Sequence, residues 1–344
     1  MNIALDATYS LGENLSGVGV YSREILFGLA ASHPQQRFAW CYRLHRYLRG
    51  RREALPLNVA ARPLLDTLPL FRNGLFHGLN QRLPHRSAGP AVCTFHDLFV
   101  LTSDYSSPDF RARFAGQARH AAQRADLIIC VSRFTANQVR DLLGVPEARL
   151  RVIPHGTHLP PAAPAARRGP VILHVGAVQL RKNLLRLVSA FERNAPPPWQ
   201  LVLAGSDGYG AAAIHERIAA SPARDRISVT GWVDNQRLDA LYASAAIFAF
   251  PSLDEGFGIP VLEAMAHGLP VISSNRSALP EACGDAALLV DPTQEEEIGL
   301  ALRRLIQDED LRNMLVRLGH SRAAEFSWQR AVDLTWKVYQ ELRA

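Results

Sequence analysis

Residues 246–273 read AIFAFPSLDEGFGIPVLEAMAHGLPVIS, and the order of signals in this stretch determines the expected fold. The apolar run AIFAF is followed by a loop that contains Gly256 and Gly258, then by Pro260 and a helical pattern, and PVIS is a second apolar run. Short apolar strands joined through a helix are typical of a parallel sheet covered by helices. Because proline is favourable at the start of a helix, the sequence predicts a helix that begins near Pro260.

The same alternation of strand and helix extends through the whole chain. A helical pattern occupies Tyr21–Ala31. Apolar runs that predict buried strands lie at 2–6, 91–96, 126–131, 171–175, 200–204, 226–229, 246–250, 270–273 and 287–290. This pattern predicts an α/β protein with doubly wound, Rossmann-like parallel sheets.

The length of 344 residues suggests two domains, at roughly 150 residues each. Residues 159–170 (LPPAAPAARRGP) have the composition of a linker and show no periodicity. We therefore expect one domain at 1–165 and a second at 166–327. Two such domains that face a cleft would place ligands at the carboxyl ends of their strands.

The charge of the chain is unevenly distributed. Residues 1–166 hold 19 Arg and no Lys against 11 acidic residues, a net +8, whereas residues 167–344 hold 19 basic and 21 acidic residues, a net −2. A basic half can serve nucleic acid, an anionic membrane or a phosphorylated substrate. Lys182 and Lys337 are the only lysines, so an Arg-rich base composition is the simpler alternative.

Four scattered cysteines predict reduced, buried thiols and a cytosolic setting. No stretch approaches the ~20 consecutive apolar residues of a membrane span. The first residues read as a buried strand rather than a signal peptide, because Asp6 is present and a basic region is absent. The cysteines are Cys41, Cys93, Cys130 and Cys283.

Glu255 and Glu263 lie on either side of the glycine loop and the expected helix start. Free N–H groups at a helix start bind a diphosphate, and carboxylates accept hydrogen bonds from diols. One carboxylate of the pair could therefore accept hydrogen bonds from a sugar on one side of a diphosphate, and the other from a ribose on the opposite side. In the alternative, Glu263 lies in the first helical turn and only offsets the helix dipole.

A second signal, GAVQLRKN at 176–183, directly follows the strand at 171–175. Arg181 and Lys182 at a strand-to-helix turn can clamp a diphosphate leaving group, because Arg offers a bidentate fork and Lys a point charge. The alternative is an ordinary solvated pair of cations on a loop.

Two further signals lie in the first half of the chain. SGVGVY (16–21) has Gly17 and Gly19 but lacks the third glycine of a dinucleotide fingerprint. His96 lies at the carboxyl end of the strand at 91–96, where a side chain would face the cleft, although a lone His more often only satisfies a hydrogen bond. Ser132 is expected to cap a helix. Metal-binding and other catalytic signatures such as HExxH, GxSxG and the Walker A motif are absent, so no metal ligand is assigned.

Several of these motifs occur in the order found in one family. EGFGIPVLE (Glu255 to Glu263), VGAVQLRKNL, VSRFTANQV, VIPHG and SGVGVY resemble the motifs of the retaining family 4 glycosyltransferases of the GT-B fold. The variant details GVGVY, FHDL and RKN look most like bacterial mannosyltransferases that build O-antigen and related polysaccharides. The resemblance covers nearly the whole chain, and it implies a hexosyltransferase whose last helix, at about 328–344, crosses back onto the first domain.

The resemblance also implies residue roles. The catalytic group would be Glu255 at the donor sugar, His96 near the acceptor, and Arg181 and Lys182 at the diphosphate. Glu263 would bind the ribose, and the segment GWVDN (231–235) would hold the base. The residues expected to line the donor site are Gly17, Gly19, Gly176, Val233, Phe257, Gly258, Ile259 and Glu263.

The implied reaction is metal-independent and needs no cofactor beyond its nucleotide-sugar substrate. GDP-mannose is the expected donor and UDP-glucose or another UDP-sugar the alternative, with a lipid-linked or growing glycan as acceptor. A sugar-nucleotide epimerase and a non-catalytic sugar-nucleotide-binding protein are the alternatives from other classes. The oligomeric state stays open.

The basic segment 43–52 predicts a contact with an anionic membrane. Arg46, Arg49, Arg51 and Arg52 alternate there with aromatic and aliphatic residues, a combination that suits lipid headgroups. A solvated Arg-rich surface is the alternative, and no recognised module supports binding to nucleic acid. The expected location is the cytoplasm, at the inner face of the cytoplasmic membrane.

Overall fold

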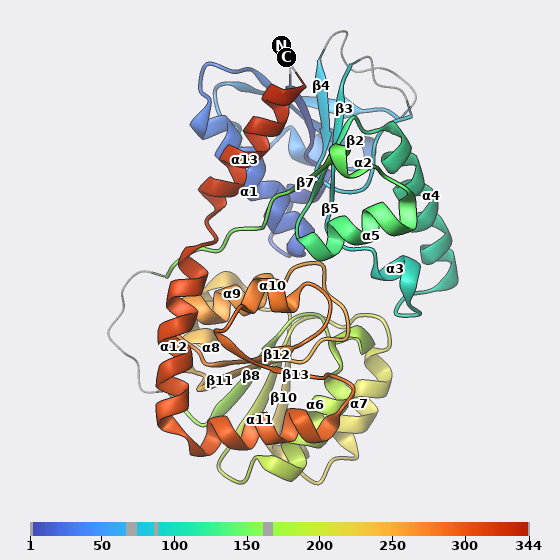
Figure 1. Cartoon of the computed structure of the whole chain (residues 1–344). Coiled ribbons are helices and arrows are strands. Elements are labelled where there is room, and N and C mark those ends of the chain that lie inside the picture. Colours follow the sequence, from blue (N-terminus) through green and yellow to red (C-terminus); the bar gives the residue numbers. More distant parts are fainter. Residues whose placement is uncertain (1–2, 67–73, 86–88, 161–167, 343–344) are drawn as a thin grey trace. The chain divides into compact units, whose positions relative to one another are not determined.

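The computed structural model describes residues 3–66, 74–85, 89–160 and 168–342, which form two compact units (Figure 1). The N-terminal unit comprises the described residues of 1–102, 108–156 and 327–344, and the C-terminal unit those of 103–107 and 157–326. The domain boundary expected at 165/166 lies outside the described residues. No helix within the described part of the chain is long and apolar enough to cross a bilayer.

The N-terminal unit contains a parallel sheet of seven strands in the order β3-β2-β1-β4-β5-β6-β7. The strands are β1 (Ile3–Asp6), β2 (Phe38–Arg43), β3 (Val59–Leu64), β4 (Leu75–Gly78), β5 (Ala91–Phe95), β6 (Leu127–Cys130) and β7 (Leu150–Val152). The helices are α1 (Gly17–Ser32), α2 (Leu44–Gly50), α3 (Phe99–Thr102), α4 (Pro108–Arg124), α5 (Arg133–Leu143) and α13 (Trp328–Glu341).

Burial explains why the central strands of this unit form. Every residue of β1, β4, β5 and β6 is buried, as expected for parallel strands covered by helices on both faces. Ser132 caps α5, as predicted, by accepting a hydrogen bond from the backbone N–H of Thr135. The four cysteines are buried free thiols, also as predicted.

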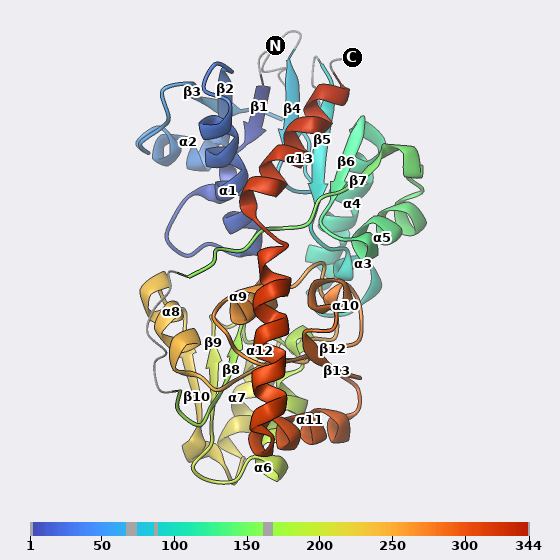
Figure 2. The ribbon, with the colours of Figure 1, turned by 60° about the vertical axis from the view of Figure 1, so that its left-hand side comes forward.

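Helix α13 lies beside α1, although almost the entire chain separates them (Figure 2). The contact is close, because a Cβ atom at Gly28 would overlap with Cγ2 of Val332. The ring of Trp336 stacks on His33 at a centroid distance of 3.7 Å. The C-terminal helix is therefore part of the N-terminal unit.

The C-terminal unit contains a parallel sheet of six strands in the order β10-β9-β8-β11-β12-β13, with helices along the sheet (Figure 1). The strands are β8 (Val171–Val175), β9 (Gln200–Ala204), β10 (Ile227–Gly231), β11 (Ile247–Phe250), β12 (Val271–Ser274) and β13 (Ala287–Val290). The helices are α6 (Leu184–Asn194), α7 (Ala211–Ala219), α8 (Asn235–Ser244), α9 (Ile259–Ala266), α10 (Leu279–Cys283), α11 (Glu295–Gln307) and α12 (Glu309–Ala324). Four short 3-10 turns complete the two units: η1 (Thr8–Ser10), η2 (Glu147–Arg149), η3 (Leu180–Lys182) and η4 (Arg224–Arg226).

The strand order reverses between β8 and β11, and a loop at such a switch point is where open α/β sheets bind ligands. The segments 176–183 and 251–258 follow these two strands. The topology therefore brings the two sequence signals of the second half to one edge of one sheet. The prediction of two doubly wound, Rossmann-like parallel-sheet domains is confirmed.

Candidate active site

Glu255, Arg181 and Lys182 form a compact ionic cluster in the C-terminal unit. The guanidinium Nη1 of Arg181 lies 2.8 Å from Oε2 of Glu255, and the ammonium of Lys182 lies 2.6 Å from Oε1. Each carboxylate oxygen thus has its own cation, and all three side chains are buried. Residues that the sequence places more than 70 positions apart are in direct contact.

The turn that carries the two cations is tied to the loop after β11. The backbone N–H of Leu253 donates a hydrogen bond to the carbonyl of Arg181 at 2.9 Å, and the Arg181 guanidinium donates to the carbonyl of Asp254. The ammonium of Lys182 lies 4.5 Å from the ring centroid of Phe250, a cation–π distance. These contacts hold the two cations at fixed positions beside Glu255.

Asn183 positions this turn, and the sequence analysis missed it. Its backbone has φ of 59°, a left-handed conformation that Asn tolerates better than most residues. Its buried side-chain amide donates hydrogen bonds to the carbonyls of Pro251 (3.1 Å) and Pro292 (2.6 Å). An Asn between a cation pair and a helix start was the available signal, because Asn can supply both a left-handed turn and two donors.

Ser277 and Ala278 hold the backbone of Glu255 and were also missed. The backbone N–H of Glu255 donates to Oγ of Ser277 at 3.0 Å, and its carbonyl accepts from the N–H of Ala278 at 3.2 Å. Both residues come from the loop after β12, which no sequence pattern linked to Glu255. The loop after β8 therefore holds the side chain of Glu255, and the loop after β12 holds its backbone.

The charges around Glu255 keep its side chain ionised. Burial alone would raise the pKa of the carboxyl group, but the positive charges and hydrogen bonds of Arg181 and Lys182 lower its pKa to about 2. At neutral pH the group is a carboxylate that accepts hydrogen bonds and has no proton to give. The carboxylate is therefore suited to accept hydrogen bonds from hydroxyl groups and not to act as a general acid.

Two glycines allow the backbone to approach closely at this edge. Gly258 has φ of +119°, and a Cβ atom there would lie 2.8 Å from Cδ2 of Leu279. Gly176 has φ of +150°, and a Cβ atom there would lie 3.2 Å from Cε of Lys182. Neither position accepts a larger residue without displacement of the loop. Phe257, between the loop and the helix, is buried against the ring of Phe326.

Glu263 lies one residue beyond the first turn of α9, in which the sequence analysis placed it, and its contact with a ribose stays a prediction. Helix α9 starts at Ile259, so Glu263 lies in the second turn rather than the first, and the first turn holds no acidic residue. A charge this far from the helix start no longer offsets the helix dipole effectively, so that alternative fails. Instead Glu263 accepts a hydrogen bond from the hydroxyl group of Tyr242 at 2.9 Å. Burial raises the pKa of its carboxyl group.

The segment 231–235 joins β10 to α8. Gly231 has φ of +68° and its carbonyl accepts from the N–H of Gly205 at 3.0 Å, so the loops after β9 and β10 are tied together. Val233 is half-buried, Trp232 is exposed, and Asp234 caps α8. Its role in holding a base stays a prediction.

Gly17, Gly19 and His96 belong to the N-terminal unit. Gly17 is the first residue of α1, and a Cβ atom at Gly19 would lie 2.9 Å from the carbonyl oxygen of Tyr9, so the helix start requires glycine there. The Nε2 of His96 donates to the carbonyl of Leu79 at 2.9 Å, and its Nδ1 faces Nε2 of His155 at 3.4 Å.

The ring of His96 is therefore engaged on both nitrogens within its own unit. Burial lowers the pKa of His96 to about 4, so the ring is neutral at physiological pH. A neutral ring in this arrangement is a fixed hydrogen-bonding group. The predicted contact of His96 with a sugar stays a prediction.

The predicted basic segment divides into two parts. Arg46 donates a hydrogen bond to the carbonyl of Leu11 at 3.0 Å and thereby anchors a loop of its own unit. Arg49, Arg51 and Arg52 are exposed. So are Leu44 (63% exposed) and Leu48 (69%), which lie one helical turn apart on α2.

Comparisons with known proteins identify the family of the chain. Residues 25–159 match the family described as Glycosyltransferase Family 4, and residues 160–322 match Glycosyl transferases group 1. The chain is 31% identical to the O-antigen chain mannosyltransferase B of Escherichia coli over 289 residues, which cover 79% of this chain and 75% of that protein. It is 30% identical to the D-inositol 3-phosphate glycosyltransferase of Corynebacterium jeikeium, over 74% of this chain and 67% of that protein.

Solved structures match over nearly the full length. Sucrose-phosphate synthase from Thermosynechococcus elongatus superposes with a TM-score of 0.81 at 22% identity, and the match covers 99% of both chains. WaaG, a glycosyltransferase of lipopolysaccharide biosynthesis, gives a TM-score of 0.71 at 16% identity and covers 98% of this chain and 99% of that chain. With its two parallel-sheet units and its Glu255–Arg181–Lys182 cluster, the chain belongs to the group 1, family 4 glycosyltransferases of the GT-B fold and is a hexosyltransferase.

Proposed function

We propose that the chain is a retaining, metal-independent mannosyltransferase that moves mannose from GDP-mannose to a lipid-linked or growing polysaccharide acceptor. The observation that carries the proposal is the cluster in which two buried cations flank the Glu255 carboxylate. The mannose is suggested by the 31% identity to an O-antigen mannosyltransferase. GT-B structures that contain UDP and glucose support UDP-glucose as the alternative donor.

The cluster supports departure of a nucleoside diphosphate without a metal ion. As the bond to the sugar breaks, negative charge grows on the diphosphate oxygens, and the charges of Arg181 and Lys182 stabilise it. Their fixed positions mean that little reorganisation is needed when the charge develops. A divalent metal ion would supply the same stabilisation and is therefore not required.

The pairing of Glu255 with two cations argues against a covalent intermediate on its carboxylate, so we propose that the acceptor attacks on the same face of the sugar. A carboxylate whose two oxygens are each paired with a cation is a weak base and a weak nucleophile, unlike the nucleophile of a retaining hydrolase. In the proposed reaction Glu255 instead accepts hydrogen bonds from the sugar hydroxyl groups. The leaving phosphate takes the proton from the acceptor hydroxyl group, and mannose keeps its configuration.

A thermal-shift screen tests the choice of donor. GDP-mannose should raise the midpoint of unfolding more than UDP-glucose or an ADP-sugar at equal concentration, because a ligand that binds only the folded state stabilises it by mass action. A larger rise in the unfolding midpoint with UDP-glucose would contradict GDP-mannose as the donor and favour UDP-glucose. If no nucleotide sugar changes the unfolding midpoint, the result would favour the hypothesis that the protein has lost this activity.

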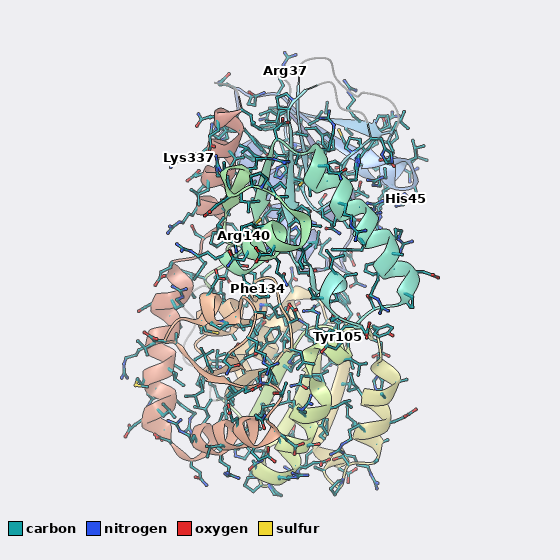
Figure 3. The ribbon with its side chains drawn as sticks, turned by 45° about the vertical axis from the view of Figure 1, so that its right-hand side comes forward. Arg37, His45, Tyr105, Phe134, Arg140 and Lys337 are labelled. Atoms are coloured by element: carbon teal, nitrogen blue, oxygen red, sulfur yellow. The ribbon has the colours of Figure 1, made fainter. Side chains whose placement is uncertain are left out.

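We also propose that α2 and the turn after it contact an anionic membrane that carries the acceptor. Leu44 and Leu48 project from α2, and His45 extends outward from the same helix (Figure 3). Arg49, Arg51 and Arg52 stand beside these apolar side chains and would meet anionic headgroups. The enzyme would then act at the cytoplasmic face of the membrane.

Liposome sedimentation tests this surface. Replacing Arg51 and Arg52 with Ser should reduce binding to vesicles with anionic lipid roughly thirtyfold, at about 1 kcal/mol per cation near the surface, and should leave binding to neutral vesicles unchanged. The matched control replaces Arg304 and Arg317, exposed on α11 and α12, with the same net change in charge. Equal binding of the test variant and the control to anionic vesicles would contradict the membrane proposal.

A further inference from the structure

We propose that Tyr242 is a positioning residue for the nucleotide: its hydroxyl group fixes the Glu263 carboxylate so that the second oxygen, Oε1, accepts a hydrogen bond from a ribose hydroxyl group. This inference rests on the proposed function, because it takes a nucleotide as the ligand. It assigns a role to a side chain that touches neither the sugar nor the diphosphate.

The hydrogen bond between Tyr242 and Glu263 is well defined. The Tyr242 hydroxyl group lies 2.9 Å from Oε2 of Glu263 and 3.5 Å from the carbonyl of Pro260. A hydroxyl group has one proton, and the carboxylate is both the nearer and the stronger acceptor. Among the residues that the structure describes, Oε1 of Glu263 makes no hydrogen bond, and the side chain is half-buried. One oxygen is thus held and the other can meet a ligand.

The ring of Tyr242 is itself fixed, so the position of its hydroxyl group is determined. Tyr242 is 1% exposed. Its ring stacks on His267 at a centroid distance of 4.9 Å and an interplanar angle of 18°, and it packs against Phe248 at 5.9 Å. Tyr242 belongs to α8, whereas Glu263 belongs to α9. The hydrogen bond from Tyr242 on α8 therefore fixes the position of the Glu263 carboxylate on α9.

Three titratable groups, Tyr242, Asp239 and His158, shift the pKa of the Glu263 carboxyl group. Burial raises its pKa, the hydrogen bond from Tyr242 lowers it, Asp239 raises it, and His158 lowers it. His267 lies beyond, with Nε2 3.6 Å from Oδ1 of Asp239, and burial lowers its own pKa. Of these groups, Tyr242 donates its hydrogen bond to the ionised form of Glu263.

The sign of the pH effect follows from this bond. A ribose hydroxyl group binds the ionised carboxylate more strongly than the protonated one, so affinity should fall as the pH falls through the pKa of Glu263. Tyr242→Phe removes the donor that favours the ionised form and moves this pKa further up. The loss of affinity on acidification should therefore begin at a higher pH in the variant.

The experiment is isothermal titration of GDP, 2′-deoxy-GDP and 3′-deoxy-GDP between pH 5 and 8. The proteins are wild type, Tyr242→Phe, Glu263→Gln and Tyr339→Phe. The last is the matched control, because it removes a buried tyrosine hydroxyl group that bonds His77 at 2.6 Å in the N-terminal unit. The ionisation of GDP itself is the same in all four titrations and cancels in the comparison.

In wild type, loss of the contacted hydroxyl group should weaken binding about tenfold, the effect of one hydrogen bond to a charged group. Tyr242→Phe should reduce this penalty to about threefold or less and move the acid-side loss of affinity to higher pH. Glu263→Gln should lose both the penalty and the pH effect, and Tyr339→Phe should match wild type.

A Tyr242→Phe variant with the deoxy penalty and pH profile of wild type would overturn the inference, whatever its stability. An unchanged deoxy penalty in Glu263→Gln would do the same. If wild type binds UDP instead of GDP, the UDP series provides the same comparison. A wild type that binds neither nucleotide overturns the proposed function, and with it this inference.

Discussion

Replacing Glu255 with glutamine should lower sugar transfer about 10²–10³-fold without weakening the binding of GDP. Glutamine keeps the size of the side chain but removes the charge that pairs with Arg181 and Lys182. In the proposed complex the two cations interact with both the Glu255 carboxylate and the diphosphate. In the variant both would be fully available to the diphosphate. Transfer fails because the sugar loses its charged hydrogen-bond acceptor.

The same variant should be less stable when no ligand is bound. Removal of one partner from a buried ion pair leaves uncompensated charge and typically costs about 3–5 kcal/mol. GDP should restore much of this loss, because its phosphates replace the missing charge. The matched control is Glu192→Gln, which removes a carboxylate paired with Arg217 at 2.6 Å elsewhere in the same unit. Near-normal transfer by Glu255→Gln, measured as kcat with GDP-mannose, would contradict the site assignment.

Replacing Lys182 with alanine should reduce both transfer and the binding of GDP. In the proposed reaction the ammonium of Lys182 lies at the diphosphate and would stabilise the leaving group more than the ground state. We expect a loss of about 10²–10³-fold in kcat/KM, comparable to the loss of one preorganised donor at a developing charge. Steady-state kinetics and titration of GDP measure the two effects.

The chain supplies its own control for this variant. Lys337, the only other lysine, is exposed on α13 and points away from the N-terminal unit (Figure 3). Lys337→Ala changes the net charge by the same amount and should leave both constants unchanged. If the two variants behaved alike, the role of Lys182 at the diphosphate would be wrong.

The fold was predictable from sequence because its central strands are buried on both faces. All nine predicted strands are present, but β2, β3, β4 and β7 were not assigned. β3 is an edge strand whose first five residues alternate between half-buried and exposed, so it lacks a continuous apolar run. β4 carries His77, whose ring is buried only because Thr94 and Tyr339 satisfy both nitrogens. A partner 262 positions away leaves no signal near the strand.

The candidate site was predictable to the same extent. Glu255, Arg181 and Lys182 stand out because charged residues at the ends of apolar strands have few structural reasons to be there. Their supporting residues are ordinary by type, and only the folded loops bring Asn183 and Ser277 to the cluster. Glu263 was placed in the first turn because the helix start was predicted at Pro260, one residue after the observed start at Ile259, and proline and glycine alone do not define a helix start to within a residue or two.

The central claim is most directly tested by following the product of GDP-mannose and a mannose-terminated oligosaccharide in EDTA by proton NMR. The account predicts that an α-linked mannose forms at the rate seen with Mg²⁺, and that Glu255→Gln forms almost none. A β-linked product, or transfer that stops in EDTA and returns with Mg²⁺, would contradict it.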